Sequence, residues 1–239
     1  MSDPPREKRK AEPSPETAGE SPGKKARVSA IHPIGHGCSV KFVDLRAYRD
    51  LIDRAILDCA PLLECKPPCR FGRMRREVGF FPVGDVSGYK YAGTESTALK
   101  TPESLSRLIA RLNELFGTTN NGALVNKYPG KGEKWSDGTV CDGEATVGEH
   151  SDSEAGLVLE DDGPYGGVIA INWGAERKFR VRDKATGRIY DFPKKEYYAM
   201  IMHGRDFQKR FVHGVPVQKK IYGTNISITL RKHQGTSDA

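Results

Sequence analysis

The sequence has no run of about eighteen apolar residues, the length that a helix needs to cross a bilayer. Its N-terminal segment also lacks the apolar stretch of a secretory signal peptide. We therefore expect a soluble, intracellular protein. Acidic residues are too few to balance the basic ones, because 31 Asp and Glu face 38 Lys and Arg and leave a formal charge of +7. This excess favours an anionic partner, such as nucleic acid or a membrane surface.

Cysteine is sparse and irregularly spaced. The chain has five cysteines, an odd number: Cys38, Cys59, Cys65, Cys69 and Cys141. Cys65 and Cys69 could supply half of a zinc site, but no second Cys/His pair follows them at ligand spacing. We therefore predict reduced structural or surface thiols.

Residues 1–30 contain no aromatic side chain and are rich in Pro, Ser, Glu and Lys. Such a segment cannot bury enough apolar surface to offset the entropy lost on ordering, so we predict a disordered tail and one domain over residues 31–239. Two basic clusters in the tail, Arg6–Lys10 and Lys24–Arg27, are spaced like a bipartite nuclear-import signal. A nuclear protein is one interpretation, and a merely solvated tail on a cytoplasmic protein is the other.

Two helices are predicted ahead of a series of strands. Apolar residues at helical spacing mark LRAYRDLIDRAIL, which follows Asp44, and SLSRLIARLNELF. For the second helix we expect Thr101 as N-cap, Pro102 at the first helical position and Gly117 at the end. Short runs rich in β-branched and aromatic residues follow: GALVNKY, GVIAINW, KFRVRD, RIYDF, YYAMIM and NISITL. The pattern predicts an α+β, mainly β fold, a largely antiparallel double sheet or barrel behind the helices.

The stretch GEHSDSEAGL places His150 two residues before Asp152. On a strand, side chains at i and i+2 point to the same face, so both could reach one metal ion. The 2-His-1-carboxylate triad of non-haem Fe(II) enzymes would complete such a site. His203 and His213 compete for the place of the third ligand. The alternative is a solvated turn that happens to contain a histidine.

Six segments, in order, resemble a known family: FFPVGDVSGYKYAG, ALVNKYPG, GEHSDSE, VIAINWGAERKFRVRDK, YAMIMHGRDFQKRFVHGVP and GTNISITLRK. From about Arg70 to His233 the chain resembles the AlkB family of Fe(II)/2-oxoglutarate-dependent dioxygenases, which dealkylate nucleic acids. The resemblance implies a double-stranded β-helix, or jelly roll, with N-terminal helices packed against it. It also implies that His213, in the family's aromatic-x-His-x-x-Pro context, is the third iron ligand beside His150 and Asp152.

The family's chemistry uses Fe(II), 2-oxoglutarate as cosubstrate, and O2. Oxidative decarboxylation of 2-oxoglutarate yields succinate and CO2, while an N-alkyl carbon on a base is hydroxylated and lost as an aldehyde. Three protein ligands leave three positions on the metal for the cosubstrate and oxygen. The resemblance thus implies an oxidative demethylase that acts on an alkylated base in DNA or RNA, and we expect a monomer that binds no membrane.

The resemblance also implies a cosubstrate pocket. Arg231 matches the family's C-terminal arginine and is expected to bind a 2-oxoglutarate carboxylate, with hydrogen bonds from Asn126 and Tyr128. In NISITLR, polar residues alternate with apolar ones, so Asn225 and Ser227 share the face of Arg231. The family usually ends R-x-N-x-T-x-R, whereas here Asn225 and Ser227 replace the first arginine and the asparagine. The ion pair to the distal carboxylate is then absent or supplied by another Lys or Arg, and we expect weaker cosubstrate binding.

Substrate contacts are predicted from the resemblance and from charge. Tyr89 and Tyr91 share a face where the family clamps a flipped base between aromatic rings, although ordinary cross-strand packing would look the same. Glu154 resembles family acids that contact the base. Arg75 and Arg76 belong to a basic segment that holds phosphates or is simply solvated. The other basic residues of that segment are Lys66, Arg70 and Arg73.

Two other functions fit parts of the sequence. A dioxygenase of the same chemistry could hydroxylate a protein, a lipid or another small molecule instead of a nucleic acid. A catalytically inactive nucleic-acid-binding module is the second alternative, and Asn225 is its only argument. Ser153 replaces an acid that is common in relatives acting on duplex DNA, which argues against a duplex substrate.

Overall fold

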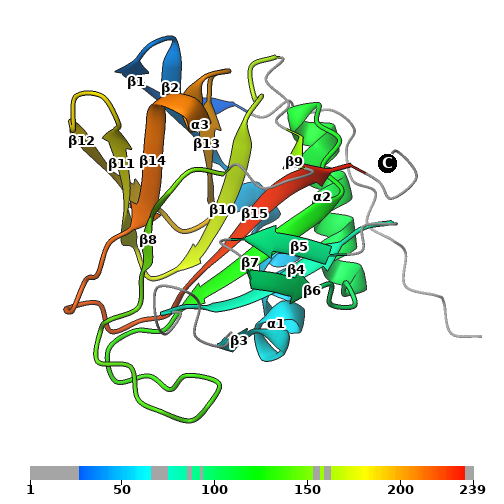
Figure 1. Cartoon of the computed structure of the whole chain (residues 1–239). Coiled ribbons are helices and arrows are strands. Elements are labelled where there is room, and N and C mark those ends of the chain that lie inside the picture. Colours follow the sequence, from blue (N-terminus) through cyan, green and yellow to red (C-terminus); the bar gives the residue numbers. More distant parts are fainter. Residues whose placement is uncertain are drawn as a thin grey trace, which may run out of the picture.

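The computed structural model describes residues 27–65, 75–84, 88–91, 94–152, 157–158 and 163–234. Two β-sheets lie face to face, and two helices cover the outer face of the larger sheet (Figure 1). This arrangement confirms the predicted jelly roll with helices packed against it. None of the helices in these ranges is long and apolar enough to cross a membrane.

The large sheet is antiparallel throughout. In spatial order its strands are β1 (Val28–Gly35), β2 (Cys38–Asp44), β13 (Tyr198–His203), β10 (Val168–Gly174), β15 (Asn225–His233), β7 (Gly122–Tyr128), β4 (Glu77–Pro82) and β3 (Glu64–Cys65), with β9 (Leu157–Val158) beside β15. The six strands predicted from short β-rich runs all form, four of them in this sheet.

The small sheet supplies the opposite wall of the sandwich. Its strands, in spatial order, are β12 (Ile189–Lys194), β11 (Arg177–Asp183), β14 (Phe211–Val215) and β8 (Val147–His150). From β7 onward the chain passes back and forth between the two sheets, which is the jelly-roll connection. A separate hairpin is formed by β5 (Gly88–Tyr91) and β6 (Thr94–Thr97).

Helices α1 (Arg49–Cys59) and α2 (Glu103–Phe116) confirm the two predicted helical segments. Gly117 closes α2 in the left-handed conformation, at φ 65°, which glycine adopts without steric strain. The predicted start of α2 is wrong by one residue, because Pro102 is the N-cap. Thr101 does not cap the helix; its hydroxyl donates a hydrogen bond to the carbonyl of Pro82 on β4 instead. Short helical turns occur at η1 (Arg46–Tyr48), η2 (Ala60–Leu62) and α3 (Phe207–Arg210).

Successive side chains of β15, a central strand of the large sheet, point alternately toward the helices and toward the small sheet. On β15, Ile226, Ile228 and Leu230 pack in one apolar cluster with α1 and α2. Ser227 and Arg231 point the other way, toward the small sheet, and are also buried. The polar face of this strand is therefore inside the sandwich and not in water, so it needs polar or charged partners there.

Strands β1 and β2 precede the helices, although the sequence pattern did not indicate them. Strand β1 begins at Val28, so the predicted tail boundary at residue 30 is too late: Val28 and Ala30 pair with Val43 and Phe42 of β2. Residues 1–26, with both basic clusters except Arg27, lie outside the described ranges.

Leu108 of α2 is fully buried against the large sheet, whereas Leu57 of α1 is 63% exposed. We expect Leu108→Ala to lower the free energy of unfolding by about 2–5 kcal/mol, because it leaves a cavity in the core. Leu57→Ala, the matched control, should change it by less than about 0.5 kcal/mol. Urea unfolding followed by circular dichroism measures both. Equal losses would contradict the described packing of α2.

Candidate metal centre and adjoining cavity

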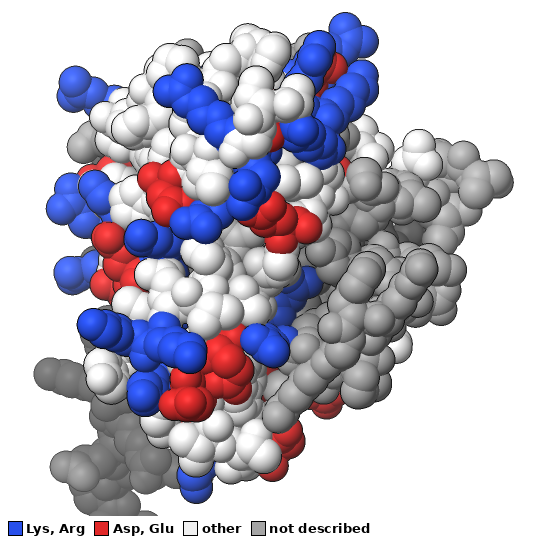
Figure 2. All heavy atoms as spheres, turned by 60° about the vertical axis from the view of Figure 1, so that its left-hand side comes forward, with Lys and Arg blue, Asp and Glu red and all other residues white. Residues whose placement is uncertain are grey.

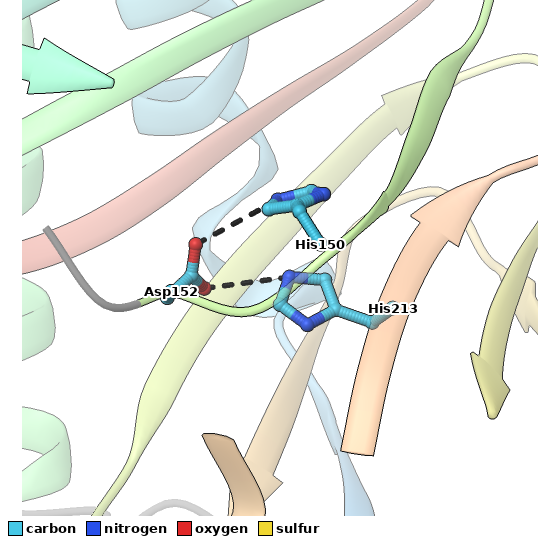
Figure 3. A group of neighbouring side chains, drawn as sticks. All are labelled: His150, Asp152 and His213. Atoms are coloured by element: carbon cyan, nitrogen blue, oxygen red, sulfur yellow. Dashed lines mark ion pairs between the residues drawn. The ribbon is translucent and has the colours of Figure 1, made fainter. Parts of the chain in front are cut away.

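His150, Asp152 and His213 form a compact cluster at the small sheet. His150 ends β8, Asp152 follows it by two residues, and His213 lies on β14 directly opposite His150. The His150 Nε2 atom is 3.7 Å from Oδ1 of Asp152, and the His213 Nε2 atom is 3.4 Å from Oδ2. All three side chains point toward one another (Figure 3). One potential ligand atom of each residue lies within 4.8 Å of the others, which suits a single metal ion.

The protonation states of the cluster favour metal binding. Burial, with a smaller contribution from His213, lowers the pKa of His150 to about 3, so its imidazole is neutral at neutral pH. Burial alone would raise the pKa of Asp152, but the charges of Arg231 and His213 hold it well below its usual value. A neutral imidazole and an ionised carboxylate are the forms that bind metals. The donor set therefore fits the 2-His-1-carboxylate arrangement typical of Fe(II).

Neighbouring groups hold the cluster in place. The carbonyl of Gly148 lies 2.8 Å from Nδ1 of His150, so the Nδ1–H tautomer donates there and leaves Nε2 for a metal. Arg231 of β15 donates from Nη2 to Oδ1 of Asp152 at 2.9 Å. The backbone N–H of Asp152 donates to the side-chain oxygen of Gln208 at 2.9 Å. Gln208 was not anticipated, because nothing in the sequence around α3 connects it with residue 152.

Of the two histidines that compete for the third position, His213 is in the cluster and His203 is not. His203 is at the end of β13 in the large sheet, and its Nδ1 atom lies 2.9 Å from the carbonyl of Gly166. His213 reaches the cluster because it lies directly opposite His150 on the adjacent strand, whereas His203 belongs to the other sheet.

A cavity between the two sheets adjoins the cluster. Its polar lining consists of His150, Asp152 and His213 together with Arg76, Asn126, Tyr128, Lys194, Ser227, Thr229 and Arg231. Four of the five predicted cosubstrate residues are therefore present. The exception is Asn225, which is fully buried and donates from its side-chain amide to the carbonyl of Trp173 at 3.1 Å. It is not among the described residues that line the cavity.

Of the predicted substrate residues, Arg75 and Arg76 are the ones whose side chains the structure describes. Arg75 is exposed, as a phosphate contact requires, whereas Arg76 is buried and faces the cavity. Tyr89 and Tyr91 belong to β5, but their side chains are outside the described part of the structure. Glu154 also lies outside it, as do Lys66, Arg70, Arg73 and Ser153.

Lys194 lines the cavity, although sequence reasoning did not single it out. It is the last residue of β12 and is only 2% exposed. The alternation of side chains along β12 could have shown that Lys194 points inward. Phe192 and Lys194 share a face of the strand, and Phe192 belongs to the apolar core between the sheets. A lysine in a run of charged residues, KKE, is more often solvated, so the signal was weak.

The outer face of the small sheet carries mixed charge. Lysine and arginine side chains are interspersed with acidic ones on this side of the molecule and form no single basic patch (Figure 2). The contacts are ion pairs: Arg180 with Asp191 at 2.8 Å and Arg182 with Glu149 at 2.8 Å. The net positive charge of the chain is therefore not concentrated on this face.

Sequence and structure comparisons place the chain among known proteins. No family model matches. The DNA oxidative demethylase ALKBH2 of Bos taurus is 24% identical over 151 residues, which are 60% of this chain and 48% of that protein. The Mus musculus ALKBH2 is 26% identical over 151 residues, 60% of this chain and 56% of that protein. The matched region thus spans about half the length of these relatives.

A solved structure, that of OsALKBH1, superposes on this chain with a TM-score of 0.50. The match covers 85% of this chain and all of that one, at 14% identity. An identity this low supports the fold alone. It confirms the jelly-roll fold, and the two sequence relatives confirm the resemblance to the AlkB family.

Removal of any one of the three candidate ligands should strongly weaken metal binding. We expect His150→Ala, Asp152→Ala and His213→Ala each to weaken Mn(II) binding by more than the roughly 10–100-fold typical of changes to groups that only support a ligand. Isothermal titration at neutral pH measures the affinity. The matched control is His203→Ala, which should bind Mn(II) like the wild type. Loss of binding in the control alone would assign the site to His203.

The Arg231–Asp152 pair should stabilise the fold more than a surface pair does. Both side chains are almost fully buried, so Arg231→Met leaves an uncompensated carboxylate and should cost about 3–5 kcal/mol of unfolding free energy at neutral pH. Arg180→Met, which breaks the half-exposed pair with Asp191, should cost less than about 1 kcal/mol.

The pair should also depend on pH in a defined direction. Because the pKa of Asp152 lies well below its usual 3.8, the stability it contributes is present above that value and is lost as the pH falls through the folded-state pKa. Urea unfolding of the metal-free protein between neutral and acid pH measures this. A cost of Arg231→Met that does not shrink in acid would contradict the depressed pKa.

Proposed function

We propose that this chain is an Fe(II)/2-oxoglutarate-dependent dioxygenase that oxidatively removes alkyl groups from bases in DNA or RNA. The observation that carries the proposal is the cluster of His150, Asp152 and His213, with ligand atoms within 4.8 Å of one another at a cavity inside a jelly roll. The similarity to the two ALKBH2 proteins, which are DNA oxidative demethylases, supports the substrate class.

The roles of the ligands follow from their positions. Iron bound by these three residues would activate O2 and the keto acid for oxidation of a C–H bond. His150 and His213 would present Nε2 atoms from adjacent strands, and Asp152 would present a carboxylate from the loop after β8. All three come from one side of the cavity, so the opposite side stays available for the cosubstrate.

The cosubstrate would lie on the inner face of the large sheet. Asn126 is buried and lines the cavity, and its side-chain oxygen has no hydrogen-bond partner among the described residues. Burial raises the pKa of Tyr128, against the opposing charges of Arg76 and Arg177, so its phenol remains a hydrogen-bond donor at neutral pH. Ser227 and Arg231 complete this wall from β15. Arg231 would bind a carboxylate of the cosubstrate and would keep its hydrogen bond to Asp152.

Nucleic acid would approach the cavity from outside, with Arg75 as one exposed phosphate contact. Tyr89, Tyr91 and Glu154 remain the proposed contacts to the base. The exposed lysines and arginine near β14, Lys209, Arg210, Lys219 and Lys220, would add phosphate contacts. Nuclear localisation is part of the same proposal and depends on the basic clusters before residue 28.

A hydroxylase of a protein or small molecule is a second candidate. The mixed charge on the outer face of the small sheet favours it, because a nucleic-acid-binding surface usually collects positive charge. An inactive binding module is disfavoured, since the three metal-binding residues lie within reach of one ion.

The two candidates differ in what stimulates turnover. With Fe(II), 2-oxoglutarate, ascorbate and O2, the wild type should release succinate faster when a methylated single-stranded oligonucleotide is added, and the methyl group should be lost. An unmethylated oligonucleotide is the matched control. His213→Ala should give no succinate above background. Succinate formation that no methylated oligonucleotide stimulates would favour the second candidate.

A further inference from the structure

We propose that the ammonium of Lys194 binds the distal carboxylate of 2-oxoglutarate and thereby replaces the arginine that is absent at position 225. This inference rests on the proposed function. It assigns the cosubstrate's second carboxylate to the small sheet, whereas the sequence pattern of the family places that contact on the last strand of the large sheet.

The first support is a buried charge without an anion. Among the described residues, the ammonium of Lys194 forms no hydrogen bond and no ion pair. Its Nζ atom lies over the Tyr128 ring, 4.8 Å from the ring centroid. Its charged neighbours are the guanidinium groups of Arg177 and Arg76. A buried cation beside two other cations is unfavourable unless an anion joins them. The side chain lines the cavity, so that anion would enter there.

The second support is the charge of the cavity wall. Among its described lining residues, three cationic side chains, Arg76, Lys194 and Arg231, face one carboxylate, that of Asp152. Arg231 is already hydrogen-bonded to Asp152. The described lining residues thus carry an excess of positive charge, before any metal is bound. An anion such as 2-oxoglutarate matches this charge, and a neutral ligand does not.

The third support is the position of Lys194 relative to Asn225. Asn225 lies directly opposite Tyr128 in the β15–β7 ladder, so an arginine there would lie beside that tyrosine. Asn225 donates its amide to the Trp173 carbonyl and leaves the cavity wall to others. Lys194 reaches the same tyrosine from the opposite sheet. Lys194 of β12 thus places a cation beside Tyr128, where an arginine at position 225 of β15 would have placed one.

Arg177 is less suited to this role than Lys194. It pairs with Lys194 in the β11–β12 ladder, but its Nη2 atom donates to the carbonyls of Tyr128 and Pro129 at 3.3 and 2.8 Å. It is not among the described residues that line the cavity. Burial, with smaller contributions from the charges of Arg177 and Arg76, lowers the pKa of Lys194 to about 7. A bound carboxylate would reverse that effect and draw a proton onto Lys194.

The test compares two keto acids on the Mn(II)-loaded protein, which binds without turnover. One is 2-oxoglutarate, and the other is 2-oxopentanoate, which has a methyl group in place of the distal carboxylate. We expect Lys194→Met to weaken 2-oxoglutarate by about ten- to hundredfold, the usual effect of losing a charge-assisted hydrogen bond. The affinities for 2-oxopentanoate and Mn(II) should not change. Lys195→Met, at the exposed neighbouring position, is the matched control.

A second readout detects the proton. Isothermal titration of 2-oxoglutarate above pH 7, in two buffers of different ionisation enthalpy, should show proton uptake by the wild type, because the lowered pKa leaves Lys194 partly neutral before binding. Lys194→Arg should keep most of the affinity and lose that uptake, since arginine is already charged. A lysine with a purely structural role would not produce this difference.

The outcomes separate this inference from the proposed function. Equal weakening of both keto acids by Lys194→Met, or an unchanged 2-oxoglutarate affinity, would overturn the role of Lys194. If Arg76→Met alone selectively weakens 2-oxoglutarate, the distal carboxylate belongs to Arg76 instead. Failure of the Mn(II)-loaded wild type to bind either keto acid would contradict the proposed function itself.

Discussion

The ion pair between Asp152 and Arg231 connects the two sheets at the candidate metal centre. The carboxylate follows strand β8 of the small sheet, the guanidinium comes from β15 of the large one, and their atoms lie 2.9 Å apart in a buried environment. Because an isolated buried charge is strongly unfavourable, each partner fixes the other. The metal cluster and the cavity wall are therefore parts of one electrostatic unit.

The interior of this sandwich combines apolar and polar side chains. Phe179, Phe192 and Met200 belong to one apolar cluster between the sheets, and Phe179 and Met200 also line the cavity beside polar residues of β7 and β15. The apolar side chains of β15 turn outward to the helices. Packing of the helices on the outer face of the large sheet thus buries apolar side chains of β15, whose inner face carries the polar residues of the cavity.

The substitution at position 225 illustrates how a binding site can keep its charge while its sequence pattern changes. A sequence motif specifies the strand on which a cation lies, whereas the binding of an anionic ligand depends on the position of that cation in space. Lys194 and Asn225 belong to different sheets and are distant in the chain, yet both adjoin Tyr128. A cavity between two sheets allows this exchange because two facing walls can reach the same ligand atom.

Local pattern in the sequence determined the two helices, six strands and the pairing of His150 with Asp152, because periodicity and i, i+2 geometry act over a few residues. The family's aromatic-x-His-x-x-Pro context indicated His213. Only the tertiary structure brought His213 opposite His150, bonded Asn225 to the Trp173 carbonyl outside the cavity lining and placed Arg76 and Lys194 in that lining. Those outcomes depend on which strands face one another across the sandwich. A single strand's alternation shows that a side chain points inward, and the opposite sheet decides what it meets there.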